Sequence, residues 1–550
     1  AGMADQLPVQ VPTEFTRAGN SDHIGMNKPI TKEMRFSYGT AGFREHSDRM
    51  AFIAYRIGYL ASLRARTTGK AVGVMITASH NPEDDNGVKI VDPDGEMLAE
   101  AWEEHATELV KCSDDEFGTG VRSLETTLNP KPLDSDSVVR TGAPWVICAR
   151  DTRVSGPHLT EAVREGARLL FAAPFQDKGE MTTPQLHYVV VARNHPNFGS
   201  EGIEGYYERF ALPFHALYAM IPTPKKYVNK LYLDCANGIG APMMRQFEGH
   251  LPENALSIDF INVAGPLNYK CGADFVKISR EAPTKFESVP VNERCAVFDG
   301  DADRLVYFYK KDDGKMELLD GDKIALLIAK FFKEHLAEIE EAADLSFAII
   351  QTAYANGNSS RYMREKLYTT PIFVPTGVKH LHHEASKYDC AIYFEANGHG
   401  TATFTEKFVQ VLKSSKSEAA RRLEYMSNVI NKIVGDAMTD LLAVELILRY
   451  YDWTVQDWAA MYEDAPSKQL KIPVEDRSLF RTTADETRLV DPADLQKTID
   501  DLVGKRSNAR AFVRPSGTEN IVRVYAESST QKEADELAKE IGDAVNALGL

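Results

Sequence analysis

The chain has 550 residues, a hydrophobic share of 43% and a formal net charge of −17. At roughly 150 residues per domain, this length predicts three or four domains. A net-negative protein repels a phosphate backbone, which argues against general binding of nucleic acid or of an anionic membrane. Small phosphorylated ligands stay compatible with this charge, because a few local cations can hold them.

The six cysteines include no Cys-x-x-Cys pair, so the spacing indicates neither a zinc knuckle nor a redox motif. Several lie within apolar runs, which favours buried free thiols in a reducing compartment, and we expect a cytoplasmic protein. Residues 1–15 are polar, and no stretch approaches the length of a membrane-spanning helix. We therefore expect neither a signal peptide nor a membrane span. No pattern indicates an oligomeric state.

Short apolar runs alternate with longer amphipathic stretches along the chain. Each run ends in a loop of Gly, Asp, Asn or Ser, and the runs are 71–76, 145–149, 231–233, 347–350 and 391–394. This alternation indicates parallel α/β units, in which ligands gather at the carboxyl ends of the strands.

Amphipathic patterns predict two helices. One covers 324–339 and follows the start signal Asp320-Gly321-Asp322, and the other covers 530–548, where Thr530 and Glu533 have the spacing of a capping box. Two polar, turn-rich stretches, 111–143 and 463–492, are typical of an insertion and of a connection to a smaller C-terminal unit. That unit is predicted to contain strands over 511–513 and 521–526 before its helix.

Ser79 follows the first apolar run, in Thr77-Ala78-Ser79-His80-Asn81-Pro82. A serine at a strand end can act as a nucleophile, although a lone serine is more often a cap or turn residue. His80 is adjacent, and Asn86-Gly87-Val88-Lys89 predicts a turn with a cation nearby. No Gly-x-Ser-x-Gly elbow surrounds Ser79, which argues against an α/β-hydrolase.

Three aspartates follow the apolar residues 296–298, in Asp299-Gly300-Asp301-Ala302-Asp303-Arg304. In extended backbone, residues two apart point to the same side, so these carboxylates can converge on one cation. An EF-hand is excluded, because Arg304 and Lys310 stand where that loop needs Gly and Glu. Mg²⁺ is favoured, since it usually shares its carboxylate site with a substrate phosphate. A solvated acidic turn is the alternative.

Two further loops carry polar chemistry. Glu395-Ala396-Asn397-Gly398-His399-Gly400-Thr401 offers the mixed donors and acceptors that sugar hydroxyls need, or is simply a satisfied polar turn. Arg514-Pro515-Ser516-Gly517-Thr518-Glu519-Asn520, with Arg523 in the following strand, has the arginines, hydroxyls and tight turn of a phosphate-binding loop. No Walker A motif is present, and Met243 breaks a dinucleotide fingerprint at Gly238-Ile239-Gly240.

These four loops, in this order, resemble the α-D-phosphohexomutase family over residues 38 to 526. Supporting segments are Thr40-Ala41-Gly42-Phe43-Arg44, 150–156 and Pro375-Thr376-Gly377-Val378-Lys379. The resemblance implies three α/β domains with mixed sheets and a smaller C-terminal α+β domain, arranged around a central cleft. We place these domains at 1–195, 196–305, 306–450 and 451–550.

The resemblance also implies roles for individual residues. Catalytic roles are implied for Ser79, Lys89, His80 and Arg44, and ligation of one Mg²⁺ for Ser79, Asp299, Asp301 and Asp303. Substrate binding is implied for Thr376, Gly377, Lys379, Glu395, Asn397, Gly398, His399 and Arg304, and phosphate binding for Arg514, Ser516, Gly517, Thr518 and Arg523. Lys89 is the preferred general base, with Lys379 and His80 as alternatives.

The implied activity is movement of a phosphate between two hydroxyls of a hexose through phosphorylated Ser79, with a sugar 1,6-bisphosphate as intermediate and activator. Ala396 and Gly398 leave space for an acetamido group, and Asn397 can hydrogen-bond to its amide. The loop Glu395-Ala396-Asn397-Gly398-His399-Gly400 also resembles that of family members acting on N-acetylglucosamine phosphates. This resemblance implies conversion of N-acetylglucosamine 6-phosphate to the 1-phosphate, which would feed UDP-N-acetylglucosamine synthesis.

Several alternatives stay open. Within the family they are a phosphoglucomutase and a phosphoglucosamine mutase. Outside it, a phosphatase with a serine phosphoenzyme would typically use two metals and histidine ligands, whereas this acidic cluster supports one ion. A non-catalytic phosphosugar-binding protein would not need a nucleophile.

Overall fold

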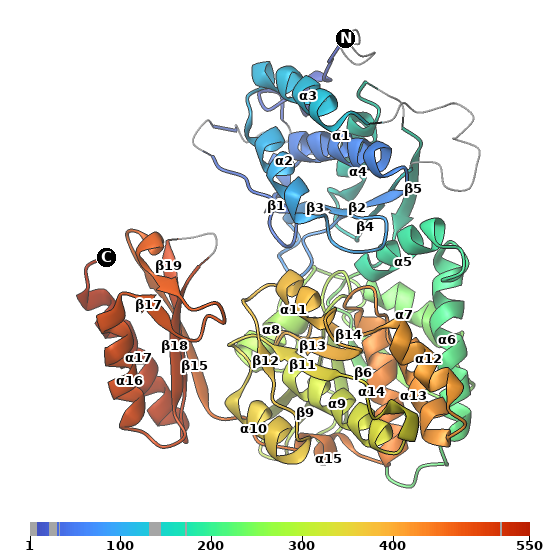
Figure 1. The fold of residues 1–550 in the computed structure, drawn as a ribbon, viewed down its shortest axis with the longest axis vertical. Helices are drawn as coiled ribbons and strands as arrows, with labels where there is room; N and C mark the ends of the chain where they lie inside the picture. The colour runs from blue at the N-terminus through green and yellow to red at the C-terminus, as the bar shows by residue number, and fades with distance from the viewer. Residues whose placement is uncertain (1–7, 21–29, 32–33, 131–144, 171–172, 517–519) are drawn as a thin grey trace. The chain divides into compact units, whose positions relative to one another are not determined.

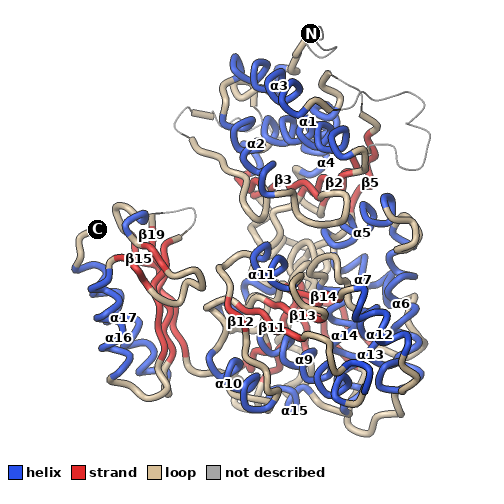
Figure 2. The backbone as a smooth tube through the Cα atoms, in the orientation of Figure 1, coloured by secondary structure: helices blue, strands red, loops and turns tan. Residues whose placement is uncertain are grey.

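The computed structural model describes residues 8–20, 30–31, 34–130, 145–170, 173–516 and 520–550. The chain divides into two compact units. The first unit is Ala1–Leu318 with Asn428–Leu446, and the second is Leu319–Ser427 with Ile447–Leu550. Helices and strands alternate through both (Figures 1 and 2). The four domain boundaries expected from the sequence stay a prediction.

The first sheet has the strand order β1-β3-β2-β4-β5. Its strands are β1 (Phe43–His46), β2 (Val72–Ile76), β3 (Asp85–Val91), β4 (Val146–Arg150) and β5 (Phe175–Glu180). β2, β4 and β5 are parallel, and β3 is antiparallel to both of its neighbours. The turn predicted at Asn86-Gly87 is wrong, because β1 pairs with both residues and the Thr77 N–H, just beyond β2, donates to Gly87 O at 3.1 Å, which keeps the segment extended.

Helices cover both faces of this sheet. They are α1 (Ala51–Thr68), α2 (Glu100–Lys111), α3 (Asp114–Leu128), α4 (Gly156–Ala167) and α5 (Thr183–Asn194), followed by α6 (Ile203–Met220). Figure 1 shows α1 and α4 on one side of the strands and α5 on the other. The insertion expected at 111–143 is wrong where the structure describes it: Ser113 and Glu116 form a capping box that starts α3, and Phe117 and Val121 are buried in the core.

The second sheet has the order β10-β9-β8-β6-β7. Its strands are β6 (Lys230–Asp234), β7 (Ser257–Ile261), β8 (Cys295–Phe298), β9 (Leu305–Lys310) and β10 (Met316–Leu319), with helices α7 (Gly240–Glu248) and α8 (Ala273–Ser279). β6, β7 and β8 are parallel, and β9 returns antiparallel to β8. The connection between β8 and β9 is the loop of three aspartates, which therefore starts at the carboxyl end of a parallel strand.

The third sheet lies in the second unit and has the order β12-β11-β13-β14. Its strands are β11 (Phe347–Gln351), β12 (Ile372–Phe373), β13 (Cys390–Phe394) and β14 (Gly400–Phe404). The helices between residues 319 and 460 are α9 (Gly321–Ala337), α10 (Gly357–Lys366), α11 (Val378–Ala385), α12 (Glu406–Ser414), α13 (Glu418–Val429), α14 (Ala437–Tyr451) and α15 (Val455–Ala459). Residues 437–446 of α14 belong to the first unit. Asp320 caps α9, as the start signal predicted. Because β11 is parallel to β12 and β13, the loops after β12 and β13 leave the same edge.

The C-terminal sheet has the order β15-β19-β18. It contains β15 (Ser467–Pro473), β18 (Arg510–Pro515) and β19 (Ile521–Glu527), beside the short pair β16 (Arg481–Thr482) and β17 (Leu489–Asp491). Helices α16 (Ala493–Gly504) and α17 (Gln531–Ala547) lie side by side along it (Figures 1 and 2). The segment 463–492 is thus more than a connection, since β15 pairs with β19 along its whole length.

Three expectations from the sequence, on fold class, cysteines and membrane spans, can be compared with this fold. Mixed sheets with helices, and a smaller C-terminal α+β part, agree with the predicted class. All six cysteines are free thiols, and five of them are buried. Within the described part of the chain, no helix combines the length and apolarity needed to cross a membrane.

Candidate active site

Ser79 lies in a tight turn at the carboxyl end of β2. It is buried, and its φ of +50° is a left-handed backbone that serine seldom adopts. Its N–H donates to Thr77 Oγ1 at 2.9 Å, and Thr77 Oγ1 donates to Asp151 at 2.7 Å. The Ser79 hydroxyl donates to Asp299 Oδ2 at 2.8 Å and lies 3.5 Å from Asp303 Oδ1. The turn therefore points this hydroxyl at the acidic loop.

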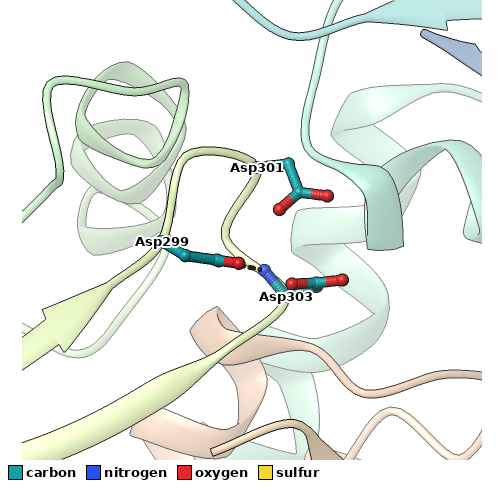
Figure 3. A group of neighbouring side chains, drawn as sticks. All are labelled: Asp299, Asp301 and Asp303. Atoms are coloured by element: carbon teal, nitrogen blue, oxygen red, sulfur yellow. Dashed lines mark hydrogen bonds between the residues drawn. The ribbon is translucent and has the colours of Figure 1, made fainter. Parts of the chain in front are cut away.

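The three aspartates gather on the loop between β8 and β9 (Figure 3). All are buried, and one carboxylate oxygen of each lies within 4.8 Å of the others. The chain turns at Ala302, where φ is +57°, and the N–H groups of Asp303 and Arg304 each donate to Asp299 Oδ1 at 3.1 Å. The carboxylates converge as predicted, but a tight turn brings them together and not the extended backbone expected.

Burial and mutual repulsion make this cluster costly without a cation. Burial, and then the carboxylates of Asp303 and Asp301, raise the pKa of Asp299 well above its usual value. Burial and Asp303 also raise the pKa of Asp301, while Lys89 and Arg44 act to lower it. Asp301 Oδ1 is buried with no hydrogen-bond partner among the described residues. Hard oxygen donors in this arrangement fit Mg²⁺.

Thr183, which the sequence analysis missed, orients one of these aspartates. At the start of α5, its hydroxyl donates to Asp301 Oδ2 at 2.6 Å and its N–H to Asp301 O at 3.3 Å. The capping box of Thr182 and Gln185 could have predicted a helix start here. It could not have predicted a contact across 118 residues.

Basic side chains approach the acidic loop from β1, β3 and the serine turn. Arg44 on β1 pairs with Gly87, and Lys89 on β3 pairs with Met75. Burial, followed by the positive charges of Arg304 and Arg44, lowers the pKa of His80 to about 2. An imidazole with so low a pKa binds a proton only weakly, so His80 is a weak candidate for a general base.

The loop after β13 is closed by its own backbone. Glu395 N donates to His399 O at 2.9 Å, and His399 N donates to Asn397 Oδ1 at 3.0 Å. Gly398 permits this with φ +94°. The loop rests on the start of α9, where Gly321 N donates to Ala396 O at 3.1 Å and a Cβ on Gly321 would lie 1.9 Å from Glu395 O. This packing fixes the backbone of the loop that carries Glu395 and Asn397.

The predicted phosphate-binding arginines are cross-strand partners, Arg514 on β18 and Arg523 on β19. Arg514 Nε donates to Glu486 Oε2 at 2.6 Å. Thr376 N donates to the other oxygen of Glu486, so this carboxylate links the loop after β12 to Arg514. Glu486 is another residue that sequence analysis missed. Ser516 is buried, whereas Gly517 and Thr518 lie outside the described residues.

The predicted site residues thus fall into two groups. The first unit brings together Ser79, His80, Lys89, Arg44, Asp299, Asp301, Asp303 and Arg304. The second unit carries Thr376, Gly377, Lys379, Glu395, Asn397, Gly398, His399, Arg514, Ser516 and Arg523.

Four family models match the chain. Residues 59–116 match the phosphoglucomutase/phosphomannomutase alpha/beta/alpha domain I, and residues 470–544 match the C-terminal domain of the same group. Between them, residues 200–306 and 320–453 match domains II and III of phosphoacetylglucosamine mutase AMG1. Fold and site together define a phosphohexomutase.

Curated relatives indicate which branch of the phosphohexomutases this chain is similar to. The phosphoacetylglucosamine mutases of Sus scrofa and Homo sapiens are each 45% identical, and each alignment covers 92% of this chain and 93% of the relative. The Saccharomyces cerevisiae and Arabidopsis thaliana proteins of the same name are each 40% identical, and each alignment covers 94% of this chain. The alignments cover 97% of the Saccharomyces cerevisiae protein and 96% of the Arabidopsis thaliana protein.

Two solved structures that are similar to this chain belong to the same group of mutases as the curated relatives. An N-acetylglucosamine-phosphate mutase in its product complex has a TM-score of 0.88 at 40% identity, covering 94% of this chain and 97% of that one. The Aspergillus fumigatus N-acetylphosphoglucosamine mutase, solved with GlcNAc-6P and magnesium, has a TM-score of 0.87 at 39% identity, covering 95% and 97%. The chain belongs to the phosphoacetylglucosamine mutase family of the α-D-phosphohexomutase superfamily.

Proposed function

We propose that this protein interconverts N-acetylglucosamine 6-phosphate and N-acetylglucosamine 1-phosphate. The observation that carries the proposal is the buried Ser79 hydroxyl, 2.8 Å from Asp299 within a cluster of three converging carboxylates. The family relationship supports the same reaction. A net charge of −17 favours a small phosphosugar over nucleic acid or an anionic membrane as the ligand. We further propose a cytoplasmic location, in keeping with the free thiols.

Ser79 carries the phosphate between substrates. In the first transfer, the bond from Ser79 Oγ to phosphorus breaks and a bond from the free sugar hydroxyl to phosphorus forms. The proton of that hydroxyl passes through Lys89, acting first as base and then as acid, to Ser79 Oγ. The resulting 1,6-bisphosphate reorients within the site, so that its other phosphate faces Ser79. Ser79 then attacks its other phosphate, and the same bonds form and break in reverse.

The acidic loop would hold the metal during both transfers. Asp299, Asp301 and Asp303 would bind Mg²⁺, which when bound neutralises charge on the phosphoryl group in transfer. Arg44 adds positive charge beside Asp301. A sugar 1,6-bisphosphate serves as activator, because it can restore the phosphate on Ser79. An Aspergillus fumigatus relative has been solved with glucose 1,6-bisphosphate, which supports this assignment.

The second unit supplies the groups proposed to bind the substrate. Arg514, Ser516 and Arg523, together with Gly517 and Thr518, hold the phosphate that does not react. Thr376, Gly377, Lys379, Glu395, Gly398 and His399 bind the sugar ring, and Arg304 is a further substrate-binding residue. Asn397 uses its Oδ1 within its own loop, and among the described residues its Nδ2 makes no hydrogen bond. That amide nitrogen can donate to the acetamido oxygen of the substrate.

Turnover followed by ³¹P NMR tests the proposal. The 6-phosphates of N-acetylglucosamine, glucosamine and glucose are compared, each with Mg²⁺ and a trace of sugar 1,6-bisphosphate, with Ser79→Ala as control. We expect the 1-phosphate to form fastest from the acetylated sugar and not at all in the control. Faster turnover of glucose 6-phosphate would still support a phosphosugar mutase, but it would contradict the proposed role of Asn397 in binding the acetamido group. Inorganic phosphate as the main product would indicate a phosphatase instead.

A further inference from the structure

Two side chains bridge the backbone of the serine turn. Asn268 Nδ2 donates to the carbonyl oxygens of Ser79, at 2.8 Å, and Asn81, at 3.0 Å. Arg153 Nη2 donates to the same two oxygens, at 3.4 Å and 2.8 Å. Each carbonyl of the turn is thus held by both an amide and a guanidinium.

The turn needs such support because of its backbone. Ser79 has φ +50°, and a non-glycine residue keeps a left-handed conformation only where its surroundings fix it. Arg153 has a second duty, because it also forms a buried ion pair with Asp151. Among the hydrogen bonds of the described residues, the Asn268 side chain donates only to the serine turn. A substitution of Asn268 therefore tests the support of Ser79 separately from the Arg153–Asp151 ion pair.

Asn268 is itself fixed in place. Its φ is +57°, a conformation that asparagine tolerates better than most residues, and its N–H donates to Ala236 O at 3.0 Å. Gly272 packs closely against it, since a Cβ on this glycine would lie 3.0 Å from Asn268 Oδ1. The loop between β7 and α8 thus presents the Asn268 amide to the serine turn in one orientation.

The acidic loop packs against the same contact. A Cβ on Gly300 would lie 2.6 Å from Ser79 O and 3.0 Å from Asn268 Nδ2. Ser79 O, the Asn268 amide and the backbone of Gly300 are therefore in direct contact. A shift of the Asn268 amide would move Ser79 relative to Asp299, which lies next to Gly300 in the chain.

We propose that Asn268 is a positioning residue for phosphoryl transfer. It locks the left-handed turn of Ser79 against the acidic loop, so that Oγ stays beside Asp299 through each transfer. Asn268 is not proposed to touch the substrate. The inference rests on the proposed function and deepens it, because it assigns the residue that fixes the position of the nucleophile.

Two variants of Asn268 separate positioning from folding. Asn268→Gly removes the amide and keeps the left-handed backbone without strain, and Asn268→Asp keeps the shape but replaces the two N–H donors with an acceptor. The matched control is Asn254→Gly, since Asn254 is exposed and also has a positive φ of 60°. Phosphorylation of Ser79 by sugar 1,6-bisphosphate is timed by intact-mass spectrometry, beside kcat, KM and thermal stability.

We expect both Asn268 variants to phosphorylate Ser79 about a hundredfold more slowly, with kcat falling alike and KM for the 6-phosphate close to that of the unmodified protein. Asn254→Gly should change none of these. An unchanged rate in a folded Asn268→Gly protein would overturn the inference, as would an equal loss in Asn254→Gly. Should Asn268→Gly not fold, Asn268→Asp is judged by the same rates. If the unmodified protein did not phosphorylate Ser79 at all, the proposed function would fail, and this inference with it.

Discussion

Glu486 accepts a hydrogen bond from Nε of Arg514 at 2.6 Å, and its other carboxylate oxygen accepts the backbone N–H of Thr376. A single carboxylate therefore fixes the position of two groups, the guanidinium proposed to bind phosphate and the loop proposed to bind the sugar. Arg514 Nη1 lies 3.4 Å from Tyr354 Oη, and Nη2 makes no hydrogen bond among the described residues. We expect the outer edge of the guanidinium to bind the substrate phosphate.

Glu486→Gln should weaken substrate binding more than it slows the chemical step. The charge-assisted bond to Arg514 would become a weaker neutral bond, and the guanidinium would lose its fixed orientation. We expect KM for N-acetylglucosamine 6-phosphate to rise roughly tenfold, which corresponds to about 1.4 kcal/mol, with a smaller change in kcat. Steady-state kinetics measure both.

The matched control for Glu486 is Asp500→Asn. It breaks the exposed Arg488–Asp500 ion pair of the same C-terminal part, at 2.7 Å, and leaves the Glu486 contacts with Arg514 and Thr376 unchanged in type. KM should stay unchanged in this variant. An equal rise of KM in both variants would mean that Glu486 acts only through the general stability of this part of the chain.

Thr183→Val should lower the affinity for Mg²⁺. Valine keeps the shape of threonine but loses the hydroxyl that donates to Asp301 Oδ2 at 2.6 Å. Loss of a group that orients a metal ligand typically costs ten- to a hundredfold in metal affinity, and we expect about tenfold here. Calorimetric titration with Mg²⁺ measures the change. Thr160→Val serves as control, at a buried threonine whose hydroxyl donates to Gly156 O within α4 and accepts from Arg150 Nη1. Equal affinity in the two variants would contradict the prediction.

Gly300→Ala should slow turnover sharply. The new Cβ would lie 2.6 Å from Ser79 O, which is backbone and cannot swing aside, so either the serine turn or the acidic loop must move. A misplacement of about 1 Å at such a site can cost about a hundredfold in rate. Measured kcat tests this, with Gly504→Ala as control because its Cβ would meet nothing within 4 Å. Normal kcat in Gly300→Ala would show that this contact is not needed.

Much of the architecture could be predicted because its signals are local. Apolar runs identified β2, β4, β11 and β13, and an apolar stripe after a capping residue identified α9. The loops of Ser79 and Asp299 each leave the carboxyl end of a parallel strand, as a general rule predicts, but the two strands belong to different sheets. That these two loops meet was implied by the family resemblance and not by the rule. Local chemistry was misleading at Asn86-Gly87, where pairing of both residues with β1 overrides a strong turn signal.

The supporting residues of the site could not be predicted, because distant contacts decide their roles. Thr183 reaches Asp301 across 118 residues, and Asn268 reaches Ser79 across 189. Glu486 reaches Thr376 across 110. Each is a single polar residue in a segment whose local pattern is ordinary. A sequence without the fold therefore shows the reacting groups but not the side chains that hold them in place.

Asp440 provides a prediction on stability and pH. This residue of α14 is fully buried, and neither carboxylate oxygen has a hydrogen-bond partner among the described residues. Burial, and then the nearby Asp436, raise the pKa of Asp440 well above its usual value. The folded protein thus holds a proton that the unfolded chain releases above its own pKa of about 3.9. Stability from this group is present at low pH and is lost as the pH rises toward the folded-state pKa.

Asp440→Asn removes the titration and should make the protein relatively more stable as the pH rises. The difference in the free energy of unfolding between this variant and the unmodified protein should grow by up to about 1.4 kcal/mol per pH unit above pH 4. Urea unfolding at pH 5, 6 and 7 measures it, at a fixed Mg²⁺ concentration so that the acidic loop contributes equally. The variant should keep its kcat. A difference that stays constant with pH would mean that Asp440 has the same pKa in the folded and unfolded chains.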